Sequence, residues 1–215
     1  MDKAPLQTPI GGVIFDVEGV IAFPDAAALA DGLRAISPEL SPAALSALRH
    51  GTDLYPLWQA YSVGTLSGDR YWSAVLDAWD RPKAAEALDA MRRLQTRATW
   101  AFLDEGVLNL ADRLRQSGLK TALLSNSCED YEPQIARFEG RFDLALFSHR
   151  TGQRKPDPAA YLTAAAALGL TPSSLLFVDD KARNVTAAAA LGFVGHLYVD
   201  AAGLKRQLAD LGHPS

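Results

Sequence analysis

The sequence predicts an α/β fold, a Rossmann-like parallel sheet flanked by helices, with a small α-helical cap domain inserted into it. Two observations support this prediction. Short apolar runs that suit strands buried on both faces of a parallel sheet alternate with amphipathic segments that suit helices. In addition, a long stretch rich in Ala, Leu and Trp, without such runs, separates the first run from the others.

Five apolar runs predict the strands, and a polar residue closely follows each of them. The runs are 13–15, 121–124, 144–147, 175–178 and 194–199. Helices are predicted over 107–116, 158–168 and 184–191, each with a glycine at or just beyond its end. Since ligands bind at the carboxyl ends of the strands in such sheets, we expect the polar residues to converge on one edge.

The stretch from about residue 25 to residue 99 predicts a bundle of about four helices. We therefore expect residues 1–22 and 100–215 to form the Rossmann-like core and residues 23–99 to form the cap. Within the cap, Arg49, His50, Trp58 and Tyr61 are candidates for contact with a substrate.

Composition excludes several classes of protein. The chain has 215 residues and a net charge of −4, so it lacks the basic character that nucleic-acid binding usually needs. No apolar run approaches the roughly 18 residues of a membrane helix, and the N-terminus lacks the layout of a signal peptide. The single cysteine, Cys128, fits a reducing compartment. We expect a cytoplasmic protein without nucleic-acid or membrane partners; the sequence does not indicate an oligomeric state.

Acidic residues are concentrated at the predicted strand ends. The carboxylates are those of Asp16, Glu18, Asp179 and Asp180. Two like charges about 4 Å apart repel by about 4 kcal/mol at an effective dielectric constant of about 20, so such a cluster needs a cation, shared protons or solvent. A hard divalent ion with oxygen ligands, magnesium, is the simplest answer. Lys155 and the hydroxyl of Ser125 could then hold the oxygens of a substrate phosphate.

Four clusters in this order resemble the haloacid dehalogenase-like hydrolase superfamily. They are Asp16–Val20, Ser125–Ser127, Lys155–Pro158 and Asp179–Asp180. The resemblance covers residues 10–23 and 106–199, and the inserted helices correspond to the family's helical cap. The first cluster departs from the family pattern at one position, because Glu18 stands where the family usually has a second Asp.

The resemblance implies a role for each matching residue. Asp16 would attack phosphorus and form an aspartyl-phosphate, and Glu18 would act as the acid–base. Magnesium would be held by Asp16, the backbone carbonyl of Glu18 and Asp180, with Asp179 acting through water or from behind these ligands. Ser125 and Asn126 would hold phosphate. Lys155 would neutralise both Asp16 and the transferred group.

The function expected from these roles is magnesium-dependent hydrolysis of a small phosphate monoester, such as a sugar phosphate. Three alternatives stay open. Dehalogenases of the superfamily usually carry Tyr at the position of Glu18, and phosphonate hydrolases usually carry a small residue there and a cap lysine. A non-catalytic protein that binds a phosphorylated ligand or a partner is the third. Arg154, beside Lys155, could be a surface charge or a phosphate contact.

Overall fold

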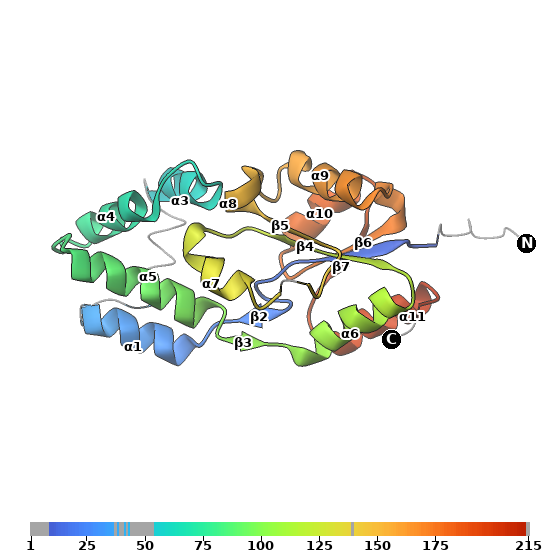
Figure 1. Cartoon of the computed structure of the whole chain (residues 1–215), viewed down its shortest axis with the longest axis horizontal. Helices are drawn as coiled ribbons and strands as arrows, with labels where there is room; N and C mark the ends of the chain where they lie inside the picture. The colour runs from blue at the N-terminus through green and yellow to red at the C-terminus, as the bar shows by residue number, and fades with distance from the viewer. Residues whose placement is uncertain are drawn as a thin grey trace, which may run out of the picture.

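The computed structural model describes residues 9–36, 38, 41, 43, 54–138 and 140–213 (Figure 1). Its centre is a five-stranded sheet in the order β5-β4-β1-β6-β7, and all four neighbouring pairs are parallel. The strands are β1 (Gly12–Phe15), β4 (Lys120–Ser125), β5 (Leu144–Phe147), β6 (Leu175–Asp179) and β7 (Val194–Leu197). The five predicted strands and the predicted fold class are therefore confirmed.

Helices cover both faces of the sheet. Helices α6 (Glu105–Gln116) and α11 (Ala201–Asp210) lie on one face, and α9 (Pro158–Leu168) and α10 (Ala182–Ala190) lie on the other (Figure 1). Alternate side chains of β1 supply the two cores, because Val13 and Phe15 pack in one hydrophobic cluster and Ile14 in the other. The predicted helix 107–116 begins two residues earlier, where the side chain of Asp104 accepts a hydrogen bond from the amide of Val107.

Short elements complete the core and are too brief for periodicity to predict. They are η1 (Glu129–Tyr131), α7 (Glu132–Ile135), α8 (Ser148–Thr151) and η2 (Pro172–Ser174). Among the helices that the structure describes, none is long and apolar enough to cross a membrane.

The described helices of the insertion gather at one end of the molecule (Figure 1). They are α1 (Ala26–Ile36), α3 (Leu54–Ser62), α4 (Gly68–Ala78) and α5 (Ala85–Thr99). The chain leaves the core through β2 (Ala22–Phe23) and returns through β3 (Phe102–Leu103), and these two strands pair antiparallel. The sequence did not predict this ribbon, because two-residue strands carry no alternation that could be recognised. The domain boundaries stay a prediction.

The insertion is tied to the core by a buried carboxylate. Asp130, in η1 of the core, accepts hydrogen bonds from the hydroxyl of Tyr61 and from Nε1 of Trp72, the latter at 2.7 Å. Its backbone oxygen also accepts from Oγ1 of Thr96 at 2.6 Å. The three donors belong to α3, α4 and α5, so one short core segment contacts three helices of the insertion. Burial, with the nearby Cys128 and Asp130, raises the pKa of Tyr61, so that its phenol remains a donor.

Candidate active site

The register of the sheet brings the predicted residues to one edge. Phe15 at the end of β1 lies opposite Leu123 of β4 and Val178 of β6. Asp16 directly follows β1, while Ser125 and Asp179 are the last residues of β4 and β6. All three are buried, so their polar groups lie away from bulk water.

Lys155 joins two of these carboxylates. Its Nζ atom lies 2.8 Å from Oδ1 of Asp16 and 2.7 Å from Oδ2 of Asp179, and the lysine is only 2% exposed. Burial raises the pKa of Asp16 to about 7; the charge of Lys155 opposes this rise and the charge of Asp179 adds to it. Burial would also raise the pKa of Asp179, but the charge and hydrogen bond of Lys155 hold that pKa below its usual value.

Both oxygens of Asp179 are occupied by protein donors. Oδ1 accepts from the amide of Lys181 at 2.8 Å, and Nδ2 of Asn184 lies 3.0 Å from Oδ1 and 2.9 Å from Oδ2. Together with Lys155 these donors fix the position and charge of Asp179. The geometry therefore fits a residue that orients Lys155 from behind the reacting groups.

Asn126 and Ser125 differ in the use of their side chains. The amide of Asn126 bonds the backbone of Lys155 twice, with Nδ2 donating to the Lys155 oxygen and Oδ1 accepting from its amide, both at 2.8 Å. This side chain positions Lys155, although Asn126 also lines the pocket. Oγ of Ser125 is buried and forms no hydrogen bond with any described residue, although Ser125 is not among the residues that line the pocket.

An acidic cluster suits a divalent cation. Asp16, Asp179 and Asp180 each offer a carboxylate oxygen, and these oxygens lie within 4.8 Å of one another. Since the oxygens of Asp179 are already bonded, Asp16 and Asp180 are the better ligands. Gly19 permits the close approach of Asp180, because a Cβ on Gly19 would lie 2.6 Å from Cγ of Asp180. Carboxylate oxygens are the donors that magnesium prefers, and so the residues present fit this ion.

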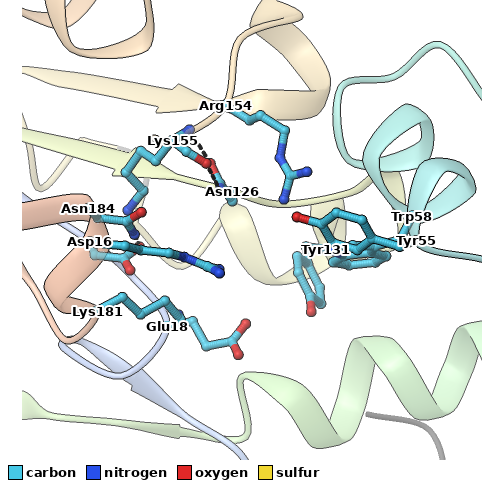
Figure 2. Close-up of a pocket in the computed structure, with 11 residues that line it drawn as sticks. Asp16, Glu18, Tyr55, Trp58, Asn126, Tyr131, Arg154, Lys155, Lys181 and Asn184 are labelled. Atoms are coloured by element: carbon cyan, nitrogen blue, oxygen red, sulfur yellow. Dashed lines mark hydrogen bonds and ion pairs between the residues drawn. The ribbon is translucent and has the colours of Figure 1, made fainter. Parts of the chain in front are cut away.

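The pocket in front of Asp16 has a catalytic end and an aromatic end (Figure 2). It is lined by Asp16, Glu18, Tyr55, Trp58, Asn126, Tyr131, Arg154, Lys155, Lys181, Arg183 and Asn184. Asp16 and Lys155 lie at one end, and the rings of Tyr55, Trp58 and Tyr131 face them from the other. The carboxylate of Glu18 points away from Asp16 and toward the aromatic end.

The pocket includes five residues that the sequence had not indicated. They are Tyr55, Tyr131, Lys181, Arg183 and Asn184. For Asn184 a signal existed, since it lies one helical turn beyond the acidic pair, but its reach to Asp179 depends on the start of α10. The aromatic residues carried no such signal. Among the cap candidates, Trp58 lines the pocket, whereas Arg49 and His50 fall outside the described residues.

Other candidate groups lie away from the chemistry. The hydroxyl of Tyr61 is bonded to Asp130. Cys128 is fully buried, and Ser127, also fully buried, places its Oγ 2.8 Å from Nδ1 of His149. Neither Cys128 nor Ser127 lines the pocket, whereas Asp16 does.

Residues 10–192 match the family model of the haloacid dehalogenase-like hydrolases. The chain belongs to this family. A curated relative, the phosphoglycolate phosphatase of Pseudomonas putida, is 30% identical over 188 residues, which cover 84% of this chain and 66% of that protein. The chain spans from a quarter to about two thirds of the length of the first four curated relatives that it matches.

Solved structures of family members share the fold. A predicted hydrolase of the family from Porphyromonas gingivalis aligns with a TM-score of 0.74 at 20% identity, covering 97% of this chain and 100% of that one. A family enzyme from Bacteroides thetaiotaomicron in complex with magnesium aligns with a TM-score of 0.74 at 16% identity, covering 93% and 100%. At these identities the likeness concerns the fold, and the acidic cluster of this chain is the separate observation that fits magnesium.

Proposed function

We propose that this hydrolase is a magnesium-dependent phosphatase that cleaves a small phosphate monoester through an aspartyl-phosphate on Asp16. The observation that carries the proposal is the buried Lys155, which lines the pocket and contacts Asp16 at 2.8 Å and Asp179 at 2.7 Å. A buried cation between two carboxylates holds Asp16 in the position of a nucleophile and adds positive charge where a phosphate would bind.

The first half of the reaction transfers the phosphoryl group to Asp16. A carboxylate oxygen of Asp16 forms a bond to phosphorus while the bond between phosphorus and the ester oxygen breaks. Glu18 gives its proton to the departing oxygen, which leaves as an alcohol. Lys155 and the hydroxyl of Ser125 bind the phosphate oxygens, and Ser125 is suited to this because its Oγ has no partner among the described residues.

The second half returns Asp16 to its starting state. Glu18, now ionised, accepts a proton from a water molecule as that water attacks phosphorus. The bond between phosphorus and Asp16 breaks, inorganic phosphate leaves, and Glu18 is protonated again. Asp179 does not react; it keeps Lys155 in place through both steps, because its oxygens are already held by Asn184 and Lys181.

The ion fits the residues left available by these contacts. The side chains of Asp16 and Asp180 would hold magnesium, and the resemblance adds the backbone carbonyl of Glu18. Bound there, the ion would reduce the repulsion between the Asp16 carboxylate and an incoming phosphate dianion. The phosphatase activity of the Pseudomonas putida relative supports the reaction class, and the enclosing insertion supports a small substrate. A cytoplasmic location and a sugar phosphate substrate also belong to this proposal.

Hydrolysis of 4-nitrophenyl phosphate with increasing magnesium tests the proposal. We expect activity that EDTA removes and magnesium restores, and that Asp16→Asn abolishes. Asp210→Asn, an exposed aspartate at the end of α11, is the matched control and should retain activity. Metal-independent chloride release from a 2-chlorocarboxylic acid, without phosphatase activity, would identify a dehalogenase. The absence of turnover across a panel of phosphate esters and phosphonates would favour a binding protein.

The role of Glu18 has its own test. Positioned acid–base catalysis contributes about 10²- to 10⁴-fold, so Glu18→Gln should reduce kcat by a factor in this range. The same variant should still accumulate the phosphorylated form of Asp16 from an activated ester such as 4-nitrophenyl phosphate, whose leaving group needs no proton. An unchanged turnover number in Glu18→Gln would exclude Glu18 as the acid–base.

A further inference from the structure

Four cationic residues line the pocket. Lys155 is paired with Asp16 and Asp179, and Lys181 lies 3.3 Å from Oδ1 of Asp180. Arg154 and Arg183 also line the pocket, yet neither has a carboxylate within 4.0 Å among the described residues. The pocket therefore holds two arginine charges that the described acidic groups do not neutralise by direct contact.

Arg154 is placed to receive a ligand. Its guanidinium reaches into the pocket between Lys155 and the ring of Tyr55 (Figure 2). The hydroxyl of Tyr55 bonds this side chain, but its Nε atom is buried without a hydrogen-bond partner among the described residues. A buried guanidinium N–H without a partner is costly, and it indicates a missing acceptor at this point.

Arg183 adds a second guanidinium near the first. The positive charge of Arg183 is close enough to Arg154 to lower the pKa of Arg154, in addition to the larger effect of burial. Arg183 and Tyr55 line the catalytic pocket and also two hollows that adjoin it. Arg154 lines the catalytic pocket and one of these hollows as well, so both arginines border space that a leaving group could occupy.

We propose that the substrate carries a second anionic group on its leaving portion, a carboxylate or a second phosphate, which Arg154 and Arg183 bind. This inference rests on the proposed function, since it names the class of ester that Asp16 attacks. An anion between the two guanidinium groups would offset their mutual repulsion and supply the acceptor that Nε of Arg154 lacks. The planar guanidinium favours carboxylate and phosphate because both can accept two parallel hydrogen bonds.

Matched pairs of esters test the proposal. 3-Phosphoglycerate differs from glycerol 3-phosphate by a carboxylate, and fructose 1,6-bisphosphate differs from fructose 6-phosphate by a second phosphate. We expect kcat/KM to be at least about tenfold higher, in one of the two pairs, for the ester that carries the second anionic group. A tenfold gain is typical of one charge-assisted hydrogen bond. The pair that shows the preference distinguishes the carboxylate from the second phosphate.

Variants of the two arginines connect the preference to the site. Arg154→Gln and Arg183→Gln should each lower the ratio of kcat/KM between the charged and the less charged ester by about 10- to 100-fold. Arg183→Lys keeps the charge and should retain part of the ratio. Arg113→Gln, an exposed arginine on α6, is the matched control and should leave the ratio unchanged. Circular dichroism and thermal melting confirm that each variant is folded.

A measurement of binding tests this inference independently of the proposed function. Isothermal titration calorimetry with Asp16→Asn and magnesium measures the affinity for the same esters without turnover. Tighter binding of the esters that carry a second anionic group would support the inference even if no ester were hydrolysed, provided that adding Arg154→Gln to the Asp16→Asn protein removes the difference. Equal affinity and equal kcat/KM within both pairs would overturn it, while hydrolysis of 4-nitrophenyl phosphate would still support the phosphatase.

Discussion

Replacing Asp130 tests whether a buried carboxylate holds the helical insertion on the core. Asp130→Asn preserves the size of the side chain but removes its charge. Oδ2 of Asp130 accepts from the Tyr61 hydroxyl and from Trp72 Nε1, and Oδ1 faces an amino group of Arg92 at 3.7 Å. With Asn, two hydrogen bonds lose their charged acceptor, and the new amide faces a cation.

The magnitude follows from the number of bonds. A hydrogen bond to a charged group contributes about 1.5–3 kcal/mol and a neutral one about 0.5–1.5, so each bond loses about 1 kcal/mol in Asp130→Asn. The total is about 2 kcal/mol, which corresponds to a fall in Tm of about 4–8 °C for a chain of this size. Asp130→Ala leaves two buried donors without an acceptor and should reduce the free energy of unfolding by about 3–5 kcal/mol.

Urea denaturation followed by circular dichroism measures these differences at neutral pH. Asp210→Asn is the control for loss of an exposed aspartate, and a double-mutant cycle with Tyr61→Phe should give a coupling energy of about 1 kcal/mol. If Asp130→Ala unfolds at the same urea concentration as wild type, the carboxylate does not anchor the insertion. A coupling energy of zero would show that Tyr61 and Asp130 act independently.

Three further predictions concern single residues. Ser125→Ala should lower kcat/KM by about 10- to 100-fold and leave Tm unchanged or slightly higher, since it removes a buried hydroxyl without a partner among the described residues; steady-state kinetics and melting curves measure both. Glu132→Gln should reduce the free energy of unfolding at pH 7 by less than about 1 kcal/mol, as for other exposed ion pairs, and should lower Tm slightly. Hydrogen bonding from Arg150 lowers the pKa of Glu132 from 4.5 to about 2. The Glu132 carboxylate therefore contributes its full stabilisation above pH 4.5 and loses it as pH falls toward 2. A Tm difference between wild type and Glu132→Gln that stays constant between pH 4.5 and pH 2 would contradict this. Gly19→Ala should weaken magnesium binding, measured by calorimetry, because its φ of 88° is strained for alanine and its Cβ would displace Asp180; an unchanged magnesium affinity would contradict this.

The sequence allowed the core and the order of its site residues to be predicted for a clear physical reason. Strands buried on both faces are continuous apolar runs, and a polar residue at the end of such a run must lie at the edge of the sheet. The apolar runs therefore predict that Asp16, Ser125 and Asp179 lie at this edge, and the register of the sheet agrees with that prediction.

Long-range contacts of polar side chains could not be predicted in this way. Asp130 lies 69 residues from Tyr61 along the chain, and no local pattern marks the pair. The aromatic end of the pocket, with Tyr55 and Tyr131, likewise depends on how the insertion packs against the core. For Asn126 the family resemblance implied phosphate binding, whereas its amide is matched to the backbone of Lys155, a contact between loops that spacing does not show.

The paired strands β2 and β3 have a consequence for how this chain could vary. The Cα positions of Phe23 and Phe102 are partners in the ribbon, so the chain departs from the core and returns to it at nearly the same point. Because the two ends of the insertion lie side by side, its length or sequence can change without altering the sheet that holds Asp16. Catalysis and substrate choice could then evolve separately, and the constraint on a new insertion would be a surface able to cover Asp130 and Tyr131.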